Sequence, residues 1–167
     1  AYITANIRTK KTSDAMAETA KRRRRPAASR KKKESPVAEQ PSRIRVGIVG
    51  GAGYTAGELI RLLVNHPYAD ISFVHSESSA GKYLYQVHGG LFGDTGLKFC
   101  DSYSLDSVDV LFLCSAHGKS REFWEQHGCP ESLKVIDLAQ DFRDESEGYV
   151  YGLPEMQKEK IGQASKL

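Results

Sequence analysis

Four glycines lie between a short apolar run and a helical pattern, and this spacing is typical of a turn that binds phosphate groups. Because glycine has no Cβ, the main chain can turn sharply and approach a ligand closely. The free N–H groups and the positive end of the following helix then face an anionic pyrophosphate. The segment Gly51-x-Gly53-x-x-Ala56 matches the dinucleotide fingerprint with alanine in the third place, and Gly50-x-x-Gly53 matches a looser variant; Gly57 is the fourth glycine.

The fingerprint requires a strand before the turn and a helix after it, and both are indicated here. Residues 44–49 form an apolar run that suits a buried parallel strand, and the apolar positions of residues 59–63 recur at helical spacing. The alternative is a turn whose glycines serve packing only. We predict that a nicotinamide dinucleotide is contacted here by Gly50, Gly51, Gly53, Tyr54 and Thr55.

The rest of residues 44–167 alternates short apolar runs with helical patterns, which predicts an α/β domain with a doubly wound parallel sheet. Further strands are expected at residues 71–75, 109–114 and 134–138, and a short helix at 120–127. Pro67 is expected to stop the first helix. The segment 76–96 contains five glycines and is expected to form loops around the ligand mouth. The chain then ends at Leu167 in a polar, weakly structured stretch.

Polar residues follow three of these strands, at the edge of the sheet where ligands of open α/β domains bind. The candidates for cofactor contact there are Ser76, Glu77, Ser78, Ser115, Ala116, His117 and Gly118. His117 has the alternative of being an ordinary surface histidine. Asp141 and Arg143 follow the fourth strand, either as a local ion pair or as ligand groups.

Neither a catalytic residue nor a metal site is predicted within this chain. Cys100, Cys114 and Cys129 are odd in number and form no C-x-x-C pair, which indicates a reducing compartment, hence the cytoplasm, without disulfides or a zinc ribbon. Cys114-x-x-His117 could suggest a thiolate with a histidine base. Cys114 ends an apolar run, however, so we expect it to be a small buried hydrophobic residue.

Residues 1–43 are expected to form a disordered basic arm, separate from the domain at 44–167. The arm has a net charge of +9 and the domain a net charge of −6. Almost no large apolar residue follows Ile7 in the arm, so it cannot bury enough surface to fold. Such an arm could bind nucleic acid or an anionic membrane, but it lacks interleaved aromatic residues, so nucleic acid is not the expected partner. No apolar run is long enough to span a membrane.

Several motifs together resemble one family, the N-acetyl-γ-glutamyl-phosphate reductases of arginine biosynthesis. The resemblance runs from about Ile44 to Leu167. It is carried by Gly50-Gly-Ala-Gly-Tyr-Thr-Ala-Gly-Glu-Leu59, Ser78-Ser-Ala-Gly-Lys82, Val87-His-Gly-Gly-Leu91, Ala116-His-Gly118, Val135-Ile-Asp-Leu-Ala-Gln-Asp-Phe-Arg143 and Tyr151-Gly-Leu-Pro-Glu155.

The resemblance implies a Rossmann domain that binds NADPH for the reduction of an acyl phosphate to a semialdehyde. In the family the nucleophilic cysteine lies in an Asn-Pro-Gly-Cys turn after the Tyr-Gly-Leu-Pro-Glu segment, and a histidine follows in a second domain. We therefore expect this chain to be the cofactor half of a longer enzyme, homo-oligomeric when complete, and inactive alone. Other acyl-phosphate reductases, such as aspartate-semialdehyde dehydrogenase, and a non-catalytic dinucleotide module with a nucleic-acid-binding arm remain alternatives.

Two positions depart from the family pattern. Where the family often has an arginine between serines, suited to the adenosine 2′-phosphate, this chain has Glu77, and an acid in that region favours the free ribose hydroxyl of NAD. NAD is therefore a possible cofactor beside NADP. The usual Leu-Pro-His-Gly loop is replaced by Cys114-Ser-Ala-His-Gly118, which keeps the His-Gly pair but loses the rigidity of proline.

Overall fold

The computed structural model describes residues 42–167, whose centre is a four-stranded parallel sheet. Its strands lie in the order β2-β1-β3-β4, and each neighbouring pair is parallel. All four predicted strands and the α/β fold class are confirmed. The strands are β1 (Ile44–Val49), β2 (Ala69–His75), β3 (Val110–Leu113) and β4 (Lys134–Asp137).

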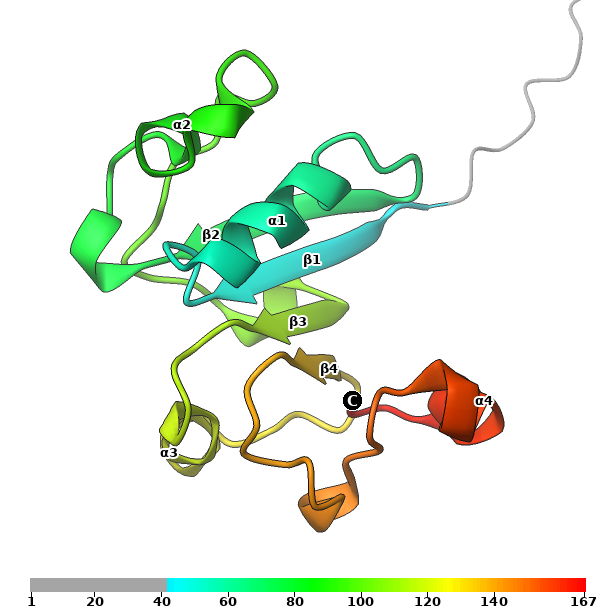
Figure 1. The fold of residues 1–167 in the computed structure, drawn as a ribbon. Coiled ribbons are helices and arrows are strands. Elements are labelled where there is room, and N and C mark those ends of the chain that lie inside the picture. The colour runs from blue at the N-terminus through cyan, green and yellow to red at the C-terminus, as the bar shows by residue number, and fades with distance from the viewer. Residues whose placement is uncertain (1–41) are drawn as a thin grey trace, which may run out of the picture. The chain divides into compact units, whose positions relative to one another are not determined.

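Both faces of the sheet are buried, because successive side chains of a strand point to opposite faces. Leu111 and Leu113 of β3 belong to one hydrophobic cluster, whereas Phe112 between them packs against the other. Helix α1 (Tyr54–Leu63) contributes Ala56 and Ile60 to the second of these clusters. Helix α3 (Lys119–His127) packs against the first, and Figure 1 shows the two helices on opposite sides of the sheet.

Two glycines of the turn between β1 and α1 are needed for the fold itself, whether or not a ligand binds. Gly50 has a φ of +80°, and a Cβ there would lie 2.7 Å from the carbonyl oxygen of Cys114. A Cβ on Gly51 would lie 2.2 Å from Cγ1 of Val74. The β1–α1 turn therefore packs closely on β2 and β3, and side chains at these two positions would force the strands apart.

Both outer strands of the sheet are flanked by further backbone. Beside β2, the Cys100 N–H donates to the Val74 carbonyl at 2.9 Å, and the Ser76 N–H donates to the Cys100 carbonyl at 3.1 Å. Beside β4, the Val135 N–H donates to the Ser165 carbonyl at 2.8 Å, and the Asp137 N–H donates to the Leu167 carbonyl at 2.7 Å. Each edge thus has partners for part of its hydrogen-bonding groups.

The segment after β2 is more ordered than its five glycines predict. It contains the 3₁₀ turn η1 (Glu77–Ser79), helix α2 (Leu84–Val87) and the 3₁₀ turn η2 (Gly89–Leu91). Leu84 and Leu91 are buried in the cluster beneath α1. The expectation of loops around the ligand mouth is therefore wrong beyond Ser78, because these leucines attach the segment to the core instead.

The expectation of a weakly structured stretch before Leu167 is also corrected. Helix α4 (Pro154–Gln163) occupies most of it, with proline at its first position, where a missing N–H costs nothing. None of its residues is buried, so it lacks the apolar periodicity by which a helix is predicted. The remaining 3₁₀ turns are η3 (Leu105–Ser107) and η4 (Ser146–Gly148).

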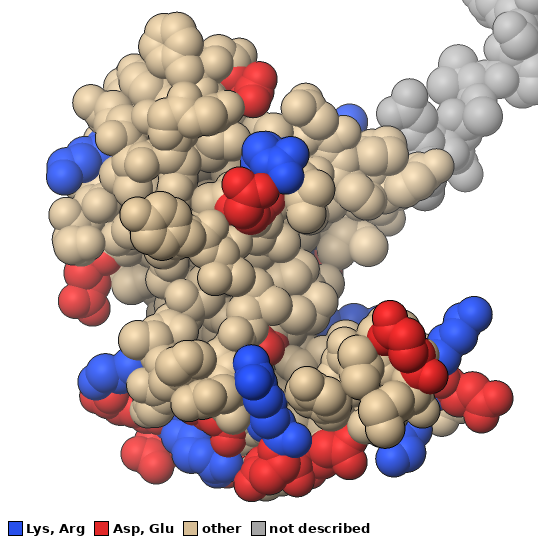
Figure 2. Space-filling view, in the orientation of Figure 1, with Lys and Arg blue, Asp and Glu red and all other residues tan. Residues whose placement is uncertain are grey.

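Charged side chains are unevenly distributed over the domain. Figure 2 shows them gathered over α3, η4 and α4, whereas the surface over α1 and α2 is largely uncharged. None of the helices in residues 42–167 has the length and apolar character needed to cross a membrane. The predicted arm lies outside the described residues except for its last two, of which Arg43 forms an ion pair with Asp70 at 2.7 Å.

Candidate functional site

A cavity of about 860 Å³ opens at the carboxyl ends of β1, β2 and β3, bordered on one side by α3. Its size is within the range of pockets that hold cofactors. The three strand ends come together here because all strands of the sheet are parallel. Seven of the twelve predicted cofactor residues line the cavity: Gly50, Gly53, Ser76, Glu77, Ser78, Ser115 and Ala116.

The other five predicted residues lie around the cavity rather than in its lining. Gly51 is buried beneath the turn against Val74. Tyr54 and Thr55 are exposed in the first turn of α1, where Tyr54 faces a separate hollow beside η2. His117 and Gly118 are exposed in the turn that leads into α3.

The cavity wall formed by the β1–α1 turn has room for a ligand at Gly53. A Cβ built there meets only the Gly50 carbonyl oxygen at 3.7 Å and the Cys114 carbonyl oxygen at 4.0 Å, which are ordinary contact distances. Gly53 also caps α1 with an extended backbone, so the positive end of that helix begins at the cavity. The backbone at Gly53 is therefore open to the approach of an anion, because no side chain screens it there.

The end of β2 contributes two hydroxyl groups and one carboxylate. Ser76 is 7% exposed, its N–H donates to the Cys100 carbonyl, and its Oγ lies 3.4 Å from Oγ of Ser78. Glu77 between them is exposed and lines the cavity. This arrangement presents polar groups suited to a ribose, together with a negative charge.

An aromatic wall on the far side of the cavity was not predicted from the sequence. Tyr103 stacks on Phe73 of β2 with ring centroids 4.7 Å apart. His127 stacks on Phe123 at 4.4 Å and lies 6.2 Å from Tyr103. Tyr103, Phe123 and His127 line the cavity, and their rings pack on one another to form one aromatic surface at its edge. The spacing of Phe123 and His127, four residues apart on a helix, is a signal that could have indicated this face.

Among the described residues that line the cavity, Lys119 is the only lysine or arginine. Its Nζ lies 2.6 Å from Oε2 of Glu122, which also lines the cavity. The hydrogen bond to this carboxylate, with its charge, raises the pKa of Lys119. Both side chains are exposed, so the pair is free to exchange partners when an anionic ligand enters.

Cys114 is partly buried and packs against the hydrophobic cluster beneath α1, so the expectation of a small buried hydrophobic residue is confirmed in part. Cys114 also lines the cavity, because it is the first residue beyond β3, where the sheet opens. Burial, and to a lesser degree the charge of Asp137, raises the pKa of the Cys114 thiol to about 12. The thiol is therefore protonated near neutral pH, whereas a nucleophilic cysteine acts as the deprotonated thiolate.

Asp141 and Arg143 do not form the ion pair that was one of the two arrangements considered from the sequence. The Asp141 carboxylate accepts hydrogen bonds from the backbone N–H groups of Gly118 at 2.7 Å and Ser120 at 2.9 Å, and so caps α3. Burial acts to raise the pKa of Asp141, but these N–H groups outweigh it and lower the pKa. Arg143 lines a different hollow at the end of β4.

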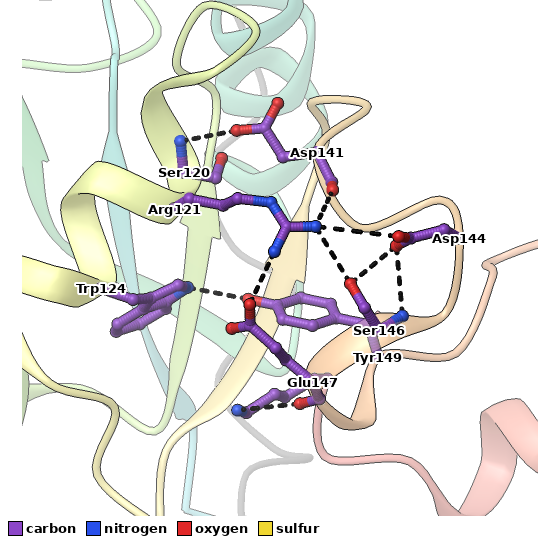
Figure 3. A network of polar contacts seen from close by, with 9 residues as sticks. Ser120, Arg121, Trp124, Asp141, Asp144, Ser146, Glu147 and Tyr149 are labelled. Atoms are coloured by element: carbon purple, nitrogen blue, oxygen red, sulfur yellow. Dashed lines mark hydrogen bonds and ion pairs between the residues drawn. The ribbon is translucent and has the colours of Figure 1, made fainter.

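A network around Arg121 holds α3 against the segment that follows β4 (Figure 3). Its guanidinium donates to Glu147 at 2.6 Å and to the Asp141 carbonyl at 2.8 Å, and lies 4.6 Å from the ring of Phe142. One helical turn further on, Nε1 of Trp124 donates to the Tyr149 hydroxyl at 2.8 Å. These contacts fix the side of α3 that faces away from the cavity, and therefore the orientation of Lys119 and Phe123 on its other side.

No cluster of three or more metal-ligating side chains occurs within residues 42–167. The side chains that line the cavity include hydroxyl, carboxylate, ammonium and aromatic groups.

An open parallel sheet with a glycine turn at the carboxyl end of its first strand defines the class of dinucleotide-binding α/β domains. The family model for the semialdehyde dehydrogenase NAD binding domain matches residues 45–164. The chain therefore belongs to this family of NAD-binding domains.

Curated relatives of the chain include N-acetyl-gamma-glutamyl-phosphate reductases of several bacteria. The protein of Parabacteroides distasonis is 53% identical over 126 residues, which are 74% of this chain and 39% of the relative. The protein of Azobacteroides pseudotrichonymphae is 56% identical over 126 residues, which are 74% of this chain and 40% of the relative. The chain thus spans about two fifths of the length of these relatives.

Among solved structures, aspartate semialdehyde dehydrogenase II of Vibrio cholerae, complexed with ASA, has a TM-score of 0.55 and 22% identity. The match covers 73% of this chain and 39% of that one. At this identity the similarity shows the fold alone.

Proposed function

We propose that this chain supplies the NADPH-binding part of an N-acetyl-γ-glutamyl-phosphate reductase, which reduces an acyl phosphate to a semialdehyde in arginine biosynthesis. The observation that carries the proposal is the glycine turn at the strand-end cavity, in a chain that is 53% and 56% identical over 126 residues to two reductases of that name. When bound, the nicotinamide supplies the hydride for the reduction. The residues described here bind and orient the cofactor.

The cofactor is proposed to lie along the cavity from the β1–α1 turn to the aromatic wall. Gly50 and Gly53 would leave room for the pyrophosphate at the positive end of α1. Ser76 and Ser78 would meet the adenosine ribose, and the adenine would stack beside Tyr103. Ser115 and Ala116 border the part of the cavity nearest β3 and are proposed to contact the nicotinamide half.

Five residues are retained as cofactor contacts on the predicted motif rather than on their position in the cavity. Gly51 shapes the turn from beneath, and Gly118 precedes α3 with a φ of +83°. The other three are exposed and stand one or two positions along the chain from residues that line the cavity: Tyr54, Thr55 and His117. Their contacts with the cofactor are proposed to form when the cofactor binds.

Preference between NADPH and NADH is proposed to depend on Glu77 and Lys119. The Glu77 carboxylate would repel a 2′-phosphate, whereas the Lys119 ammonium would attract one. NADPH is the cofactor that we propose, with NADH binding retained because of Glu77.

Catalysis by the complete protein is proposed to use groups outside the described residues. Cys114 carries a protonated thiol, and no hydrogen bond joins it to His117 in the described chain. We also propose that the complete protein is a cytoplasmic homo-oligomer, and that residues 1–43 do not bind nucleic acid in its function.

Binding of the cofactor can be tested with the 167-residue chain by titrating it with NADPH, NADH and AMP in a calorimeter. We expect saturable binding of both dinucleotides and weaker binding of AMP, because AMP lacks the second phosphate of the pyrophosphate and the nicotinamide half of the dinucleotide. Circular dichroism establishes that the sample is folded. A folded chain that binds neither dinucleotide would refute the proposed function.

A further inference from the structure

The half-buried side chain of His88 contacts the glycine turn from the α2 side of the domain. Its Nε2 lies 2.7 Å from the carbonyl oxygen of Gly51, 37 residues earlier in the chain. Because a carbonyl oxygen only accepts hydrogen bonds, Nε2 must carry the proton that joins the two groups. We propose that His88 is a positioning residue for dinucleotide binding, which acts by holding the Gly51 peptide in its orientation. This inference rests on the proposed function.

The hydrogen bond fixes a peptide group that borders the cavity. A trans peptide is planar, so the Ala52 N–H points opposite to the Gly51 carbonyl and thus away from His88. Ala52 lines the cavity, and no protein group in residues 42–167 accepts a hydrogen bond from its N–H. By fixing the carbonyl, His88 therefore also fixes a free donor in the turn that is proposed to face the pyrophosphate.

The two sides of Gly51 are held by different parts of the fold. Its N–H donates to the His75 carbonyl at the end of β2, at 2.9 Å. Its carbonyl is held by His88 alone among the described side chains. Loss of His88 would thus leave the strand-side attachment intact and release only the peptide next to Ala52.

The fold provides a fitted space for the imidazole ring. A Cβ on Gly57 in α1 would lie 2.6 Å from Nδ1 and 2.9 Å from Cε1 of His88, so glycine is required there for the ring to reach the turn. The backbone of His88 is anchored as well, because its N–H donates to the carbonyl of buried Leu84 at 2.9 Å. Its ring therefore has little freedom to move away from Gly51.

Gly57, the fourth glycine of the β1–α1 segment, leaves space for the ring of His88. Gly57 lies outside the cavity lining, so it does not leave room for the cofactor. Instead it leaves room for His88, which in turn orients the peptide that borders the cavity.

The test compares binding of NADPH with binding of 2′-AMP, which has the adenosine 2′-phosphate but no pyrophosphate. We expect His88→Phe, which keeps a ring but removes the donor, to weaken NADPH binding about 3- to 10-fold, the scale of one hydrogen bond. Binding of 2′-AMP should not change. His88→Gln, whose amide can replace Nε2 as the donor, should bind NADPH within about twofold of the wild type.

A second pair of variants tests the contact from the α1 side and does not depend on the stability of His88→Phe. Gly57→Ala should displace the ring and weaken NADPH binding about as much as His88→Phe. In a His88→Ala background, Gly57→Ala should have no further effect, because the atoms with which its Cβ collides are absent. Circular dichroism and melting temperatures are measured for every variant.

The outcomes separate this inference from the proposed function. Equal NADPH affinity of the wild type and His88→Phe would refute the positioning role and leave the cofactor proposal standing. Parallel losses of NADPH and 2′-AMP binding would also refute it, since they indicate a general structural effect. A wild-type chain that is folded but binds no NADPH would overturn both.

Discussion

Substitutions of the glycines in the β1–α1 turn should have different effects, because one of them leaves room for the ligand and the others are needed for folding. Gly53 adopts a φ of −75°, which any residue can adopt, and a Cβ there has no protein atom closer than 3.7 Å. Gly50 has a φ of +80°, and its Cβ would lie 2.7 Å from a backbone oxygen. Gly53→Ala should therefore impair cofactor binding without loss of stability, and Gly50→Ala should unfold the domain more easily.

The expected free energies follow from these contacts. For Gly53→Ala, reduced freedom of the unfolded chain stabilises by about 0.4–1 kcal/mol, and loss of a preferred helix cap destabilises by about the same amount. For Gly50→Ala, the left-handed backbone costs about 1–2 kcal/mol, and the collision with an immobile backbone atom adds about 1–3 kcal/mol. The melting temperature should fall by about 10 °C or more for Gly50→Ala and remain nearly unchanged for Gly53→Ala.

Calorimetric titration of the same samples gives the second half of the comparison. The new methyl group of Gly53→Ala lies in the cavity beside the Gly50 and Cys114 carbonyls, where the pyrophosphate is proposed to bind. We expect NADPH binding at least about tenfold weaker, equivalent to about 1.4 kcal/mol, and a larger loss for Gly53→Val. Wild-type affinity in a folded Gly53→Ala variant would refute the reasoning.

Four further outcomes are expected. Glu77→Arg should shift the ratio of NADPH to NADH affinity toward NADPH by about 1–3 kcal/mol, and an unchanged ratio would mean that this residue points away from the ribose. Cys114, with a pKa of about 12, should react slowly with iodoacetamide near pH 8 and about ten times faster for each pH unit up to about pH 10; rapid labelling at pH 8 would contradict its protonated state. Burial raises the pKa of Asp137, so the ionised carboxylate destabilises the fold at pH values above the raised pKa, and this cost disappears as the pH falls. Asp137→Asn should therefore raise the melting temperature more at pH 7 than at pH 4. An equal change at both pH values would argue against burial as the cause. Deletion of residues 1–41 should leave NADPH affinity unchanged, whereas a marked loss would assign part of the site to that segment.

Strands were predictable here because parallel strands buried on both faces have nearly continuous apolar sequences. The predicted run at 44–49 matches β1, and the run at 109–114 exceeds β3 by one residue at each end, whereas β2 begins two residues earlier than predicted, at Ala69. The small Ala69 side chain gives no apolar signal on its own, although it is 8% exposed in the structure. Helix α4 could not be predicted, because all of its side chains face solvent at least in part.

The strand-end portion of the site followed from topology, because parallel strands bring their carboxyl ends to one edge. The aromatic wall could not be predicted from topology. Which side of α3 faces the cavity is determined by the contacts that the opposite side makes, such as the hydrogen bond between Trp124 and Tyr149. His88 was also missed as a neighbour of the turn. Its contact with Gly51 joins residues 37 positions apart, and no local pattern encodes that distance.

The backbone that flanks β2 and β4 has a consequence for how this domain behaves at high concentration. An open sheet with two bare edges offers unpaired N–H and C=O groups to which a strand of another molecule can add, and this is a common start of aggregation. Here Cys100 occupies one edge, and residues 165–167 occupy the other. A chain shortened by those three residues should keep its core but expose β4, and it should self-associate where the longer chain stays dispersed.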